Sequence, residues 1–380
     1  MNYLSIVLPC LNESETLQIC LEKCFKSLKK YPEKCEVIVA DNGSTDGSQE
    51  IAKRYGAKIV TVLEKGYGSA LRGGIAAANS KFILMADADD SYALDEIDIF
   101  IQELEKGHDL VMGNRFKGGI QKGAMPWLHK YIGNPVLSLI GKTLFNIKIN
   151  DFHCGIRAFK KESIEKLNLK TKGMEFASEM IVKAAMKNLK ITEVPTILKK
   201  DGRSRKPHLK TWSDGWKHLV FMLTSSPKWL FIYPGLFLNL MTLIGVFTLL
   251  IGPINFLQYQ IHLNSYFILI GLNLISTQLI ILGVLSEIFS DSYSLLKKKS
   301  ILFHSFSFER SLITGLLFFT IGVISLAVIF YFWDGNSIEN IDFETSLKIS
   351  GLVVLLMGIG IQLIFSSFFG QMLKNKVNSA

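Results

Sequence analysis

Three long stretches without charged side chains constrain this chain more than any other feature of its sequence. Asp, Glu, Lys and Arg are absent from residues 229–286, 311–333 and 349–373. Each stretch reaches or exceeds the ~20 apolar residues that an α-helix needs to cross a bilayer, and the first is long enough for two crossings. The pattern therefore predicts four transmembrane helices, near 230–251, 265–287, 311–333 and 349–370.

A soluble protein with four such helices in its core would need an equally large polar shell. The chain has 380 residues, of which 49 % are hydrophobic, a composition too apolar for that alternative. Basic residues gather in the loop after the second predicted span and in the tail after the fourth, whereas the loop after the third is acidic. By the positive-inside rule, we expect a multi-pass integral membrane protein with its amino-terminal domain and both termini in the cytoplasm. No signal peptide is predicted before the first strand.

The amino-terminal domain, residues 1–223, alternates apolar strand-like runs with helical patterns. Strands are predicted at Tyr3–Pro9, Glu36–Ala40, Lys58–Val62 and Phe82–Met85, and polar loops follow them. This alternation is typical of a parallel α/β sheet, which binds ligands at the carboxyl ends of its strands.

The last of these strands runs directly into Asp87, Asp89 and Asp90. Carboxylates crowded at the end of a hydrophobic strand repel one another unless a cation offsets their charge. Asp87 and Asp89, at alternate positions, suit a hard divalent ion such as Mg²⁺ or Mn²⁺ that also holds phosphate oxygens. The alternative is a solvated acidic turn, which is the usual meaning of an isolated DxD sequence.

Two other polar loops are candidates for ligand contact. Asp41 begins the loop DNGSTDGS and could accept hydrogen bonds from a nucleobase or ribose. A helix N-cap or an Asx turn is the alternative for this residue. The Gly-rich turn KGYGSALRGG, residues 65–74, is typical of phosphate-binding loops, although it lacks both the Walker GK[ST] sequence and the dinucleotide fingerprint.

These loops belong to a longer series of motifs. The segments PCLNESETL, DNGSTDGS, KGYGSALRGG, MADAD, GNRF and DFHCGIRAF occur in the order found in family 2 glycosyltransferases. Over roughly residues 3–223, the chain resembles polyprenyl-phosphate glycosyltransferases, the dolichol-phosphate mannose and glucose synthase group. The resemblance implies a cytoplasmic domain with a GT-A fold, which is a Rossmann-like α/β domain with a mostly parallel sheet. A C-terminal four-helix transmembrane region, residues 229–380, would follow it.

The resemblance also assigns roles to individual residues. Asp41 would contact the nucleobase, and Asp87 and Asp89 would form a DxD metal site that holds the sugar-nucleotide diphosphate. The predicted donor-binding residues are Pro9, Asn12, Glu13, Asp41, Gly68, Asp87, Ala88 and Asp89.

The acceptor is expected to lie at the membrane surface. Residues 118–150 and 207–228 mix aromatic and aliphatic side chains with lysines, and we predict that they form helices at the membrane interface. Ordinary amphipathic helices packed on the sheet are the alternative. The resemblance places Arg115, in the GNR motif, near the acceptor phosphate. Asp151 is a reserve catalytic candidate that we expect instead to order its loop through Arg157.

Lysine and arginine are concentrated in residues 199–212. Such a run, considered alone, is most often a solvated or membrane-facing loop. The resemblance implies a loop that closes over the donor diphosphate and the lipid phosphate, with Arg203, Arg205 and Lys206 as phosphate ligands. The predicted catalytic residues are thus Asp89, Arg115 and Arg203.

The predicted reaction moves one sugar, with inversion, from a UDP-glucose-like or GDP-mannose-like donor to a polyprenyl phosphate. The attacking phosphate oxygen is already anionic, so a general base is not required, and basic residues offset the repulsion between two polyanions. Two alternatives stay open. One is a glycosyltransferase of cell-surface polysaccharide or glycolipid synthesis, against which the absence of a QxxRW motif argues. The other is an inactive membrane scaffold for lipid-linked sugar transport, against which the intact acidic and basic residues argue.

Net charge and cysteine content indicate which binding partners and cofactors to expect. The formal net charge of +9 suits an anionic membrane surface and anionic substrates, and no nucleic-acid-binding motif is present. The five cysteines show no CxxC spacing, so neither disulfides nor zinc are predicted for a reducing compartment. The spans are expected mainly to anchor the domain, and Gly351, Gly358 and Gly360 would also permit homo-oligomerisation.

Overall fold

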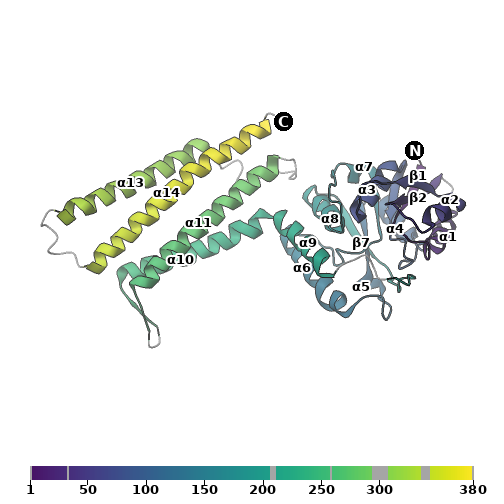
Figure 1. Cartoon of the computed structure of the whole chain (residues 1–380), viewed down its shortest axis with the longest axis horizontal. Helices are drawn as coiled ribbons and strands as arrows, with labels where there is room; N and C mark the ends of the chain where they lie inside the picture. Colours follow the sequence, from purple (N-terminus) through teal and green to yellow (C-terminus); the bar gives the residue numbers. More distant parts are fainter. Residues whose placement is uncertain are drawn as a thin grey trace. The chain divides into compact units, whose positions relative to one another are not determined.

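The chain forms two compact units, Met1–Ser225 and Ser226–Ala380. The computed structural model describes residues 2–31, 34–205, 211–256, 259–292, 307–334 and 343–378 of them (Figure 1). The first unit is an α/β structure. The described part of the second is helical apart from a short hairpin of β8, Ile254–Phe256, and β9, Tyr259–Ile261.

Seven of the described strands form the sheet of the first unit, in the order β3-β2-β1-β4-β6-β5-β7. β6 runs antiparallel to β4 and β5, and the other neighbours are parallel. The mostly parallel sheet predicted from the sequence is confirmed, and β6 adds an antiparallel strand that the pattern does not predict. The strands are β1 Asn2–Cys10, β2 Cys35–Asp41, β3 Lys58–Thr61, β4 Ser80–Met85, β5 Leu110–Asn114, β6 Arg157–Lys160 and β7 Ile191–Pro195.

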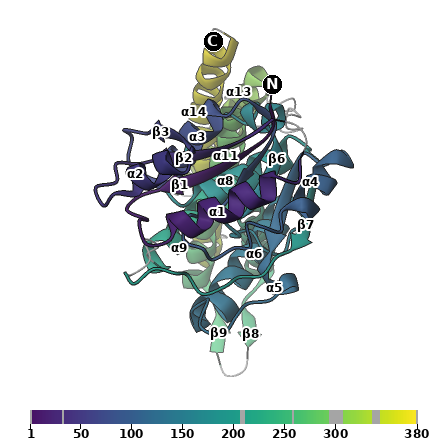
Figure 2. The same ribbon diagram turned by 90° about the vertical axis from the view of Figure 1, so that its right-hand side faces the viewer.

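Helices cover both faces of this sheet, as a mostly parallel sheet requires. Leu4, Ile6 and Leu8 of β1 join one core with α1 and α4, and Val7 joins a second core with α3 and α8, because successive side chains of a strand point to opposite faces. Figure 2 shows α1 lying across one face of the strands. The helices of this unit are α1 Leu17–Leu28, α2 Ser48–Arg54, α3 Tyr67–Ala77, α4 Asp98–Glu105, α5 Arg115–Gly118, η1 His129–Gly133, α6 Asn134–Phe145, α7 Lys161–Glu165, α8 Phe176–Met186 and α9 Thr211–Thr224.

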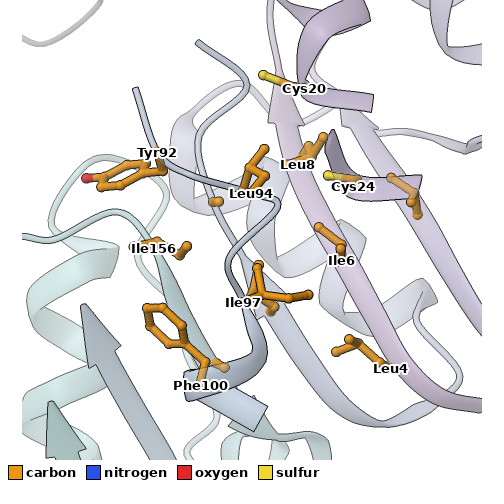
Figure 3. Close-up of a cluster of buried hydrophobic side chains, with 14 of the residues drawn as sticks. Leu4, Ile6, Leu8, Cys20, Cys24, Tyr92, Leu94, Ile97, Phe100 and Ile156 are labelled. Atoms are coloured by element: carbon orange, nitrogen blue, oxygen red, sulfur yellow. The ribbon is translucent and has the colours of Figure 1, made fainter. Parts of the chain in front are cut away.

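The first of the two cores is drawn in Figure 3. Side chains of β1 share this core with Cys20 and Cys24 of α1 and Phe100 of α4, all of them at most 1 % exposed. Each fully buried aliphatic or aromatic side chain of this kind stabilises the fold by about 1.5–3 kcal/mol. The five cysteines, all within the described residues, are free thiols. Cys20 and Cys24 therefore act as small apolar core residues.

The carboxyl ends of β1, β2 and β4 meet at one edge of the sheet. These strands are parallel, and their register sets Cys10 beside Asp41 and Val7 beside Met85. The loops that follow them, residues 11–16, 42–47 and 86–91, therefore lie next to one another. The polar loops that the sequence predicts after these strands thus lie at one edge of the sheet.

Four helices of the second unit are long and apolar enough to cross a membrane, as far as the structure describes the chain. They match the four predicted spans in number and order. α10 packs on α11, α11 on α14 and α14 on α13 (Figure 1). The helices of this unit are η2 Lys228–Ile232, α10 Tyr233–Ile251, α11 Leu263–Ser292, α13 Phe308–Asp334 and α14 Phe343–Asn378.

Polar side chains of α10 and α11 bond to each other across their interface. The Asn239 amide donates to Ser276 Oγ and Thr277 Oγ1, both at 3.1 Å. The Asn273 amide donates to Thr242 Oγ1 at 2.9 Å. Lipid is as apolar as the helices, so no hydrophobic driving force brings them together in a membrane. Interhelical hydrogen bonds of this kind help to hold them together instead.

The glycines of α14 serve contacts inside the chain. A Cβ at Gly351 would lie 2.6 Å from the Tyr266 ring, and one at Gly358 would lie 2.7 Å from Leu274 of α11. A Cβ at Gly360 would lie 2.7 Å from the backbone nitrogen of Phe319 on α13. Homo-oligomerisation stays a prediction, and these glycines already have a role in the packing of α14.

We predict that Gly360→Leu destabilises the membrane unit, because the new side chain meets backbone atoms that cannot move aside. Overpacking of this kind typically costs about 1–3 kcal/mol. Thermal unfolding of the detergent-purified chain, followed by circular dichroism, should show a lower midpoint. Gly271→Leu is the matched control, because nothing lies within 4 Å of a Cβ at that glycine. Equal midpoints for the two variants would contradict the packing role of Gly360.

Candidate active site

Two carboxylates follow the carboxyl end of β4. Asp89 is 8 % exposed, and its Oδ1 accepts hydrogen bonds from Ser91 N at 3.1 Å and Ser91 Oγ at 2.6 Å. Asp87 Oδ1 accepts a hydrogen bond from Tyr67 OH at 3.0 Å, at the first residue of α3. Asp89 is thus held by its own loop and Asp87 by α3, and these hydrogen bonds fix both carboxylates in place.

The Asp87 carboxyl resists ionisation. Burial raises its pKa to about 6, and the charge of Asp89 adds to the effect, while the Tyr67 hydrogen bond opposes it. Gly155 faces this side chain: a Cβ there would lie 2.3 Å from Asp87 Oδ2. A positive charge placed beside the pair would relieve the repulsion. Two carboxylates are also the hard oxygen donors that Mg²⁺ and Mn²⁺ prefer, so the residues present fit such an ion.

Arg203 supplies a positive charge at this point. Its Nη2 lies 2.7 Å from Asp89 Oδ2, and its Nη1 lies 3.2 Å from Glu13 Oε1. Burial raises the pKa of Glu13, and Arg203 and Arg205 counteract part of that rise. Burial alone would lower the pKa of the Arg203 guanidinium, but the charges of Asp89, Glu13 and Asp201 raise it overall. The structure therefore brings together a predicted phosphate ligand and two predicted donor-site residues.

Arg205 also contacts Glu13. Its Nη2 lies 2.9 Å from Glu13 Oε1, and the same atom donates to the carbonyl oxygens of Leu11 and Asn12 at 3.0 and 2.7 Å. Asn12 Oδ1 accepts a hydrogen bond from Thr45 N at 2.8 Å, which joins the first polar loop to the second. Lys206, the third predicted phosphate ligand, lies outside the described residues.

Asp41 is fully buried and bound by its own loop. Its carboxylate accepts hydrogen bonds from Gly43 N at 3.0 Å, Ser44 N at 3.2 Å and Gln49 Nε2 at 2.7 Å. This is the Asx-type turn that the sequence left open as an alternative. Gly43 suits the turn because its φ of 92° is unfavourable for other residues. A nucleobase contact by Asp41 stays a prediction.

The three remaining donor-site candidates make backbone and packing contacts within the fold. Pro9 pairs with Ala40 in the register of β1 and β2. Gly68 of α3 is buried, and a Cβ there would lie 2.6 Å from the carbonyl oxygen of Thr171. Ala88 is 3 % exposed, and its carbonyl oxygen accepts a hydrogen bond from Thr16 Oγ1 at 2.7 Å. Their contact with a donor is a prediction that these packing contacts leave untested.

Asp151 pairs with Arg115, and the expectation that it acts through Arg157 is wrong. Asp151 Oδ2 accepts from Arg115 N at 3.0 Å and Nε at 2.7 Å, and Oδ1 accepts from Nη2 at 2.7 Å. Both side chains are buried, so the bidentate contact fixes two of the three guanidinium nitrogens. The charge of Arg115 also acts to lower the pKa of Asp87, against the larger effect of burial. A contact between Arg115 and the acceptor phosphate stays a prediction.

Arg157 orders its loop through backbone carbonyls. Its three guanidinium nitrogens donate to the carbonyl oxygens of Cys154 at 3.0 Å, Ala177 at 2.6 Å and Phe152 at 2.9 Å. The side chain is fully buried, and burial lowers its pKa. Arg157 therefore has a structural role, in which it joins the loop of residues 152–154 to α8.

A pair of histidines packs next to this loop. The rings of His153 and His218 lie 4.5 Å apart, and His218 Nδ1 lies 2.9 Å from Ser178 Oγ. Burial lowers the pKa of His218 to about 4, and it lowers the pKa of His153 well below its usual range. Both rings are therefore neutral at physiological pH.

Sequence reasoning missed several residues that build the site. Tyr67 bonds to Asp87 and Ser91 bonds to Asp89, and Asp201 contacts Arg203 at 3.2 Å. Gly155 leaves room for Asp87. Tyr67 and Gly155 lie inside two of the motifs that carry the family resemblance. Ser91 follows the acidic segment directly, and Asp201 lies within the basic segment, residues 199–212. Proximity to those motifs was the available signal.

Comparison with known proteins identifies the class. Residues 5–167 match the family model described as glycosyl transferase family 2, and residues 284–374 match the glycosyltransferase family 2 C-terminal transmembrane region. The low-salt glycan biosynthesis hexosyltransferase Agl6 of Haloferax volcanii is 32 % identical over 379 residues, which cover 96 % of this chain and 87 % of that protein. The dolichyl-phosphate hexose transferase of the same organism is 28 % identical over 162 residues, 43 % of this chain and 69 % of that protein.

Among solved structures, glucosyl-3-phosphoglycerate synthase from Mycobacterium tuberculosis, in complex with Mn²⁺, uridine diphosphate and glucosyl-3-phosphoglycerate, aligns with a TM-score of 0.47 and 20 % identity. The alignment covers 59 % of this chain and 80 % of that one.

The sheet, the acidic edge and the apolar helices are thus those of a membrane glycosyltransferase. The chain belongs to glycosyltransferase family 2, and it is an integral membrane protein that carries the C-terminal transmembrane region of that family. This confirms the predicted enzyme class and the predicted fold class, a GT-A domain followed by a transmembrane region.

We predict that Asp151→Asn strongly destabilises the first unit, because it leaves the Arg115 charge buried with a weaker partner. Removing one member of a buried ion pair typically costs about 3–5 kcal/mol. Chemical unfolding of the purified chain, followed by tryptophan fluorescence, measures the loss. Asp95→Asn is the control, because the Lys26–Asp95 pair spans 3.6 Å with its lysine 72 % exposed, and it should change little. Similar losses in the two variants would show that Asp151 has no special structural role.

A second prediction concerns acid stability. The folded chain keeps His218 neutral down to about pH 4, whereas the unfolded chain protonates it below about 6.5. The unfolded state therefore binds more protons in that window, and stability falls as the pH drops through it, by up to about 3 kcal/mol. His218→Asn should lose less stability than wild type between pH 7 and pH 4.5 in thermal unfolding. An equal loss of stability in His218→Asn and wild type over this pH range would contradict the prediction.

Proposed function

We propose that this protein transfers one sugar from a nucleotide-sugar to the phosphate of a polyprenyl phosphate, with inversion at the anomeric carbon. The donor would be UDP-glucose-like or GDP-mannose-like. The catalytic domain and both termini would face the cytoplasm. The dolichyl-phosphate hexose transferase among its relatives supports this acceptor class.

One observation carries the proposal: acids and arginines meet at the carboxyl edge of the sheet. Asp87 and Asp89 can hold a cation, and Arg203 and Arg205 reach the same place from the basic segment. Both substrates of the proposed reaction are polyanions. Cations placed between them offset their repulsion and let the reacting groups approach.

Asp87 and Asp89 would hold Mg²⁺ or Mn²⁺ together with donor phosphate oxygens. The ion would supply positive charge for the departing nucleoside diphosphate. Within the described residues, no group of three or more His, Cys, Asp and Glu side chains is arranged to hold a metal. Donor phosphate oxygens and water would complete the shell around the two carboxylates.

Basic residues would handle the acceptor. The attacking phosphate oxygen is anionic, so the step needs no general base. Arg115, Arg203, Arg205 and Lys206 are the proposed phosphate ligands. Arg115 is held by Asp151, so it would present its remaining guanidinium nitrogen rather than the whole fork. Positioning and charge would supply most of the rate enhancement.

Exposed aromatic side chains support a membrane-bound acceptor. Trp127 and Tyr131 beside α6 are 66 % and 57 % exposed, and Trp212 and Trp216 of α9 are 80 % and 66 % exposed. Large aromatic side chains seldom stay in water in such numbers, and they are favoured at membrane interfaces. We propose that both segments rest in the headgroup layer and that the spans anchor the domain there.

The alternative acceptor is a sugar hydroxyl, as in a glycan-building transferase. The relative that matches nearly the whole chain is named for glycan biosynthesis, which is the observation that favours this alternative. An assay must therefore offer both kinds of acceptor.

The proposal predicts metal-dependent transfer of radiolabelled sugar to lipid. Membranes containing the chain would receive undecaprenyl or dolichyl phosphate, a panel of UDP- and GDP-sugars, and Mn²⁺ or Mg²⁺. A chloroform-soluble, acid-labile product is expected. Asp89→Asn should lower its formation at least about 100-fold, because charge stabilisation of the leaving group is worth several kcal/mol.

Asp90→Asn is the matched control for this assay. Asp90 is the adjacent acid, and it pairs with Lys23 of α1 rather than with Arg203. It should keep most of the activity. Product that forms only with a polyprenyl-linked sugar would select the alternative acceptor, and background from wild type across both acceptor panels would refute the proposal.

A further inference from the structure

Both carboxylate oxygens of Asp89 are occupied by the chain itself. Oδ1 accepts from Ser91, and Oδ2 faces Arg203 Nη2 at 2.7 Å. The two side chains are each only 11 % exposed, so this ion pair is largely shielded from water. A positive charge therefore already lies at the carboxylate that the proposed function gives to a divalent ion.

Arg203 bridges three acids at once. Nη2 contacts Asp89 and Asp201, and Nη1 contacts Glu13. The planar guanidinium offers several donors in a fixed fork, so it can satisfy separate carboxylates simultaneously where a lysine would satisfy fewer. It thus offsets the same like-charge repulsion that a bound metal would offset.

The segment that carries Arg203 is docked through its backbone. Lys199 N donates to Ser91 O at 2.9 Å, and Gly202 N donates to Asp89 O at 3.0 Å. Ser204 donates to Glu15 through its backbone nitrogen and its hydroxyl, both at 2.6 Å. These anchors lie on both sides of Arg203 and do not involve its guanidinium. The side chain can therefore leave the acids while the segment stays in place.

We propose that Arg203 is a built-in substitute for the metal ion, which keeps the donor site closed until metal and nucleotide displace it. A divalent ion that binds Asp89 Oδ2 would compete with the Arg203 guanidinium for the same oxygen, and the two positive charges would repel each other, so the ion would displace the arginine. The displaced guanidinium becomes available to a phosphate. Arg203 is thereby withheld from phosphate until the ion has displaced it from Asp89. The inference rests on the proposed metal and donor site.

The test is Mn²⁺ binding without turnover. The full chain is purified in detergent and titrated with Mn²⁺ alone, with free Mn²⁺ followed by electron paramagnetic resonance. Arg203→Ala should bind Mn²⁺ at least about tenfold more tightly than wild type, equivalent to about 1.4 kcal/mol. Arg203→Lys, which keeps the charge but loses the fork, should lie between them. Binding by Arg203→Ala that equals or is weaker than wild type would overturn the proposal.

Arg205→Ala is the matched control. It removes the same charge from the same segment, but the ion pair of Arg205 is to Glu13, and its hydrogen bonds are to the carbonyl oxygens of Leu11 and Asn12. A much smaller gain is expected from it. Equal gains from the two arginines would show a general charge effect and refute a specific exchange at Asp89.

Asp89→Asn separates failure of this inference from failure of the proposed site. If it binds Mn²⁺ as wild type does, the metal lies elsewhere and the proposed donor site is wrong. If it loses Mn²⁺ binding while Arg203→Ala matches wild type, the site stands and only the exchange is refuted. Thermal unfolding of each variant confirms that it is folded before titration.

Discussion

Crowding of negative charge at one edge of the sheet is the constraint on which the site depends. Asp87, Asp89 and Glu13 come from loops after two parallel neighbours, β1 and β4, so the register of the strands forces them together. Each is treated differently. Burial favours the protonated form of Asp87, whereas Asp89 is bound by Ser91 and Arg203. A site of this composition is stable only with protons or cations present, which suits it to substrates that arrive with a metal ion.

The buried strands, the polar loops after them and the membrane spans could be predicted from the sequence, because each depends on a short run of neighbouring residues. A run such as Phe82–Met85 is apolar because the strand is buried on both faces, and the polar residues after it mark the edge where ligands bind. The absence of charge from residues 229–286 follows from the same physics applied to lipid. The parallel α/β sheet and the edge at which its polar loops lie could therefore be predicted without any knowledge of side-chain contacts.

The choice of ion-pair partner could not be predicted in this way. Arg157 stands close to Asp151 in the sequence, whereas Arg115 is 36 residues away and reaches Asp151 only in the packed structure. β6 inserts antiparallel between β4 and β5, and Arg157 at its start is enclosed by the carbonyls of Phe152, Cys154 and Ala177. Arg115 is then the arginine left for Asp151. The pairing of Asp151 depends on β6, the antiparallel strand that the sequence periodicity does not predict. The wrong prediction for Asp151 therefore follows from the missing strand.

An arginine among acids also explains why the basic segment is anchored as it is. A guanidinium fork that bridges Glu13 and Asp89 matches two phosphate oxygens equally well, so one side chain can serve two successive partners. That exchange requires a support that neither partner disturbs. The bonds from Lys199 and Gly202 to the acidic loop are made by backbone atoms, and Ser204 is held by Glu15 outside the acidic centre. Because the anchors are separate from the exchanging group, the cation can change partners without loss of the segment's position.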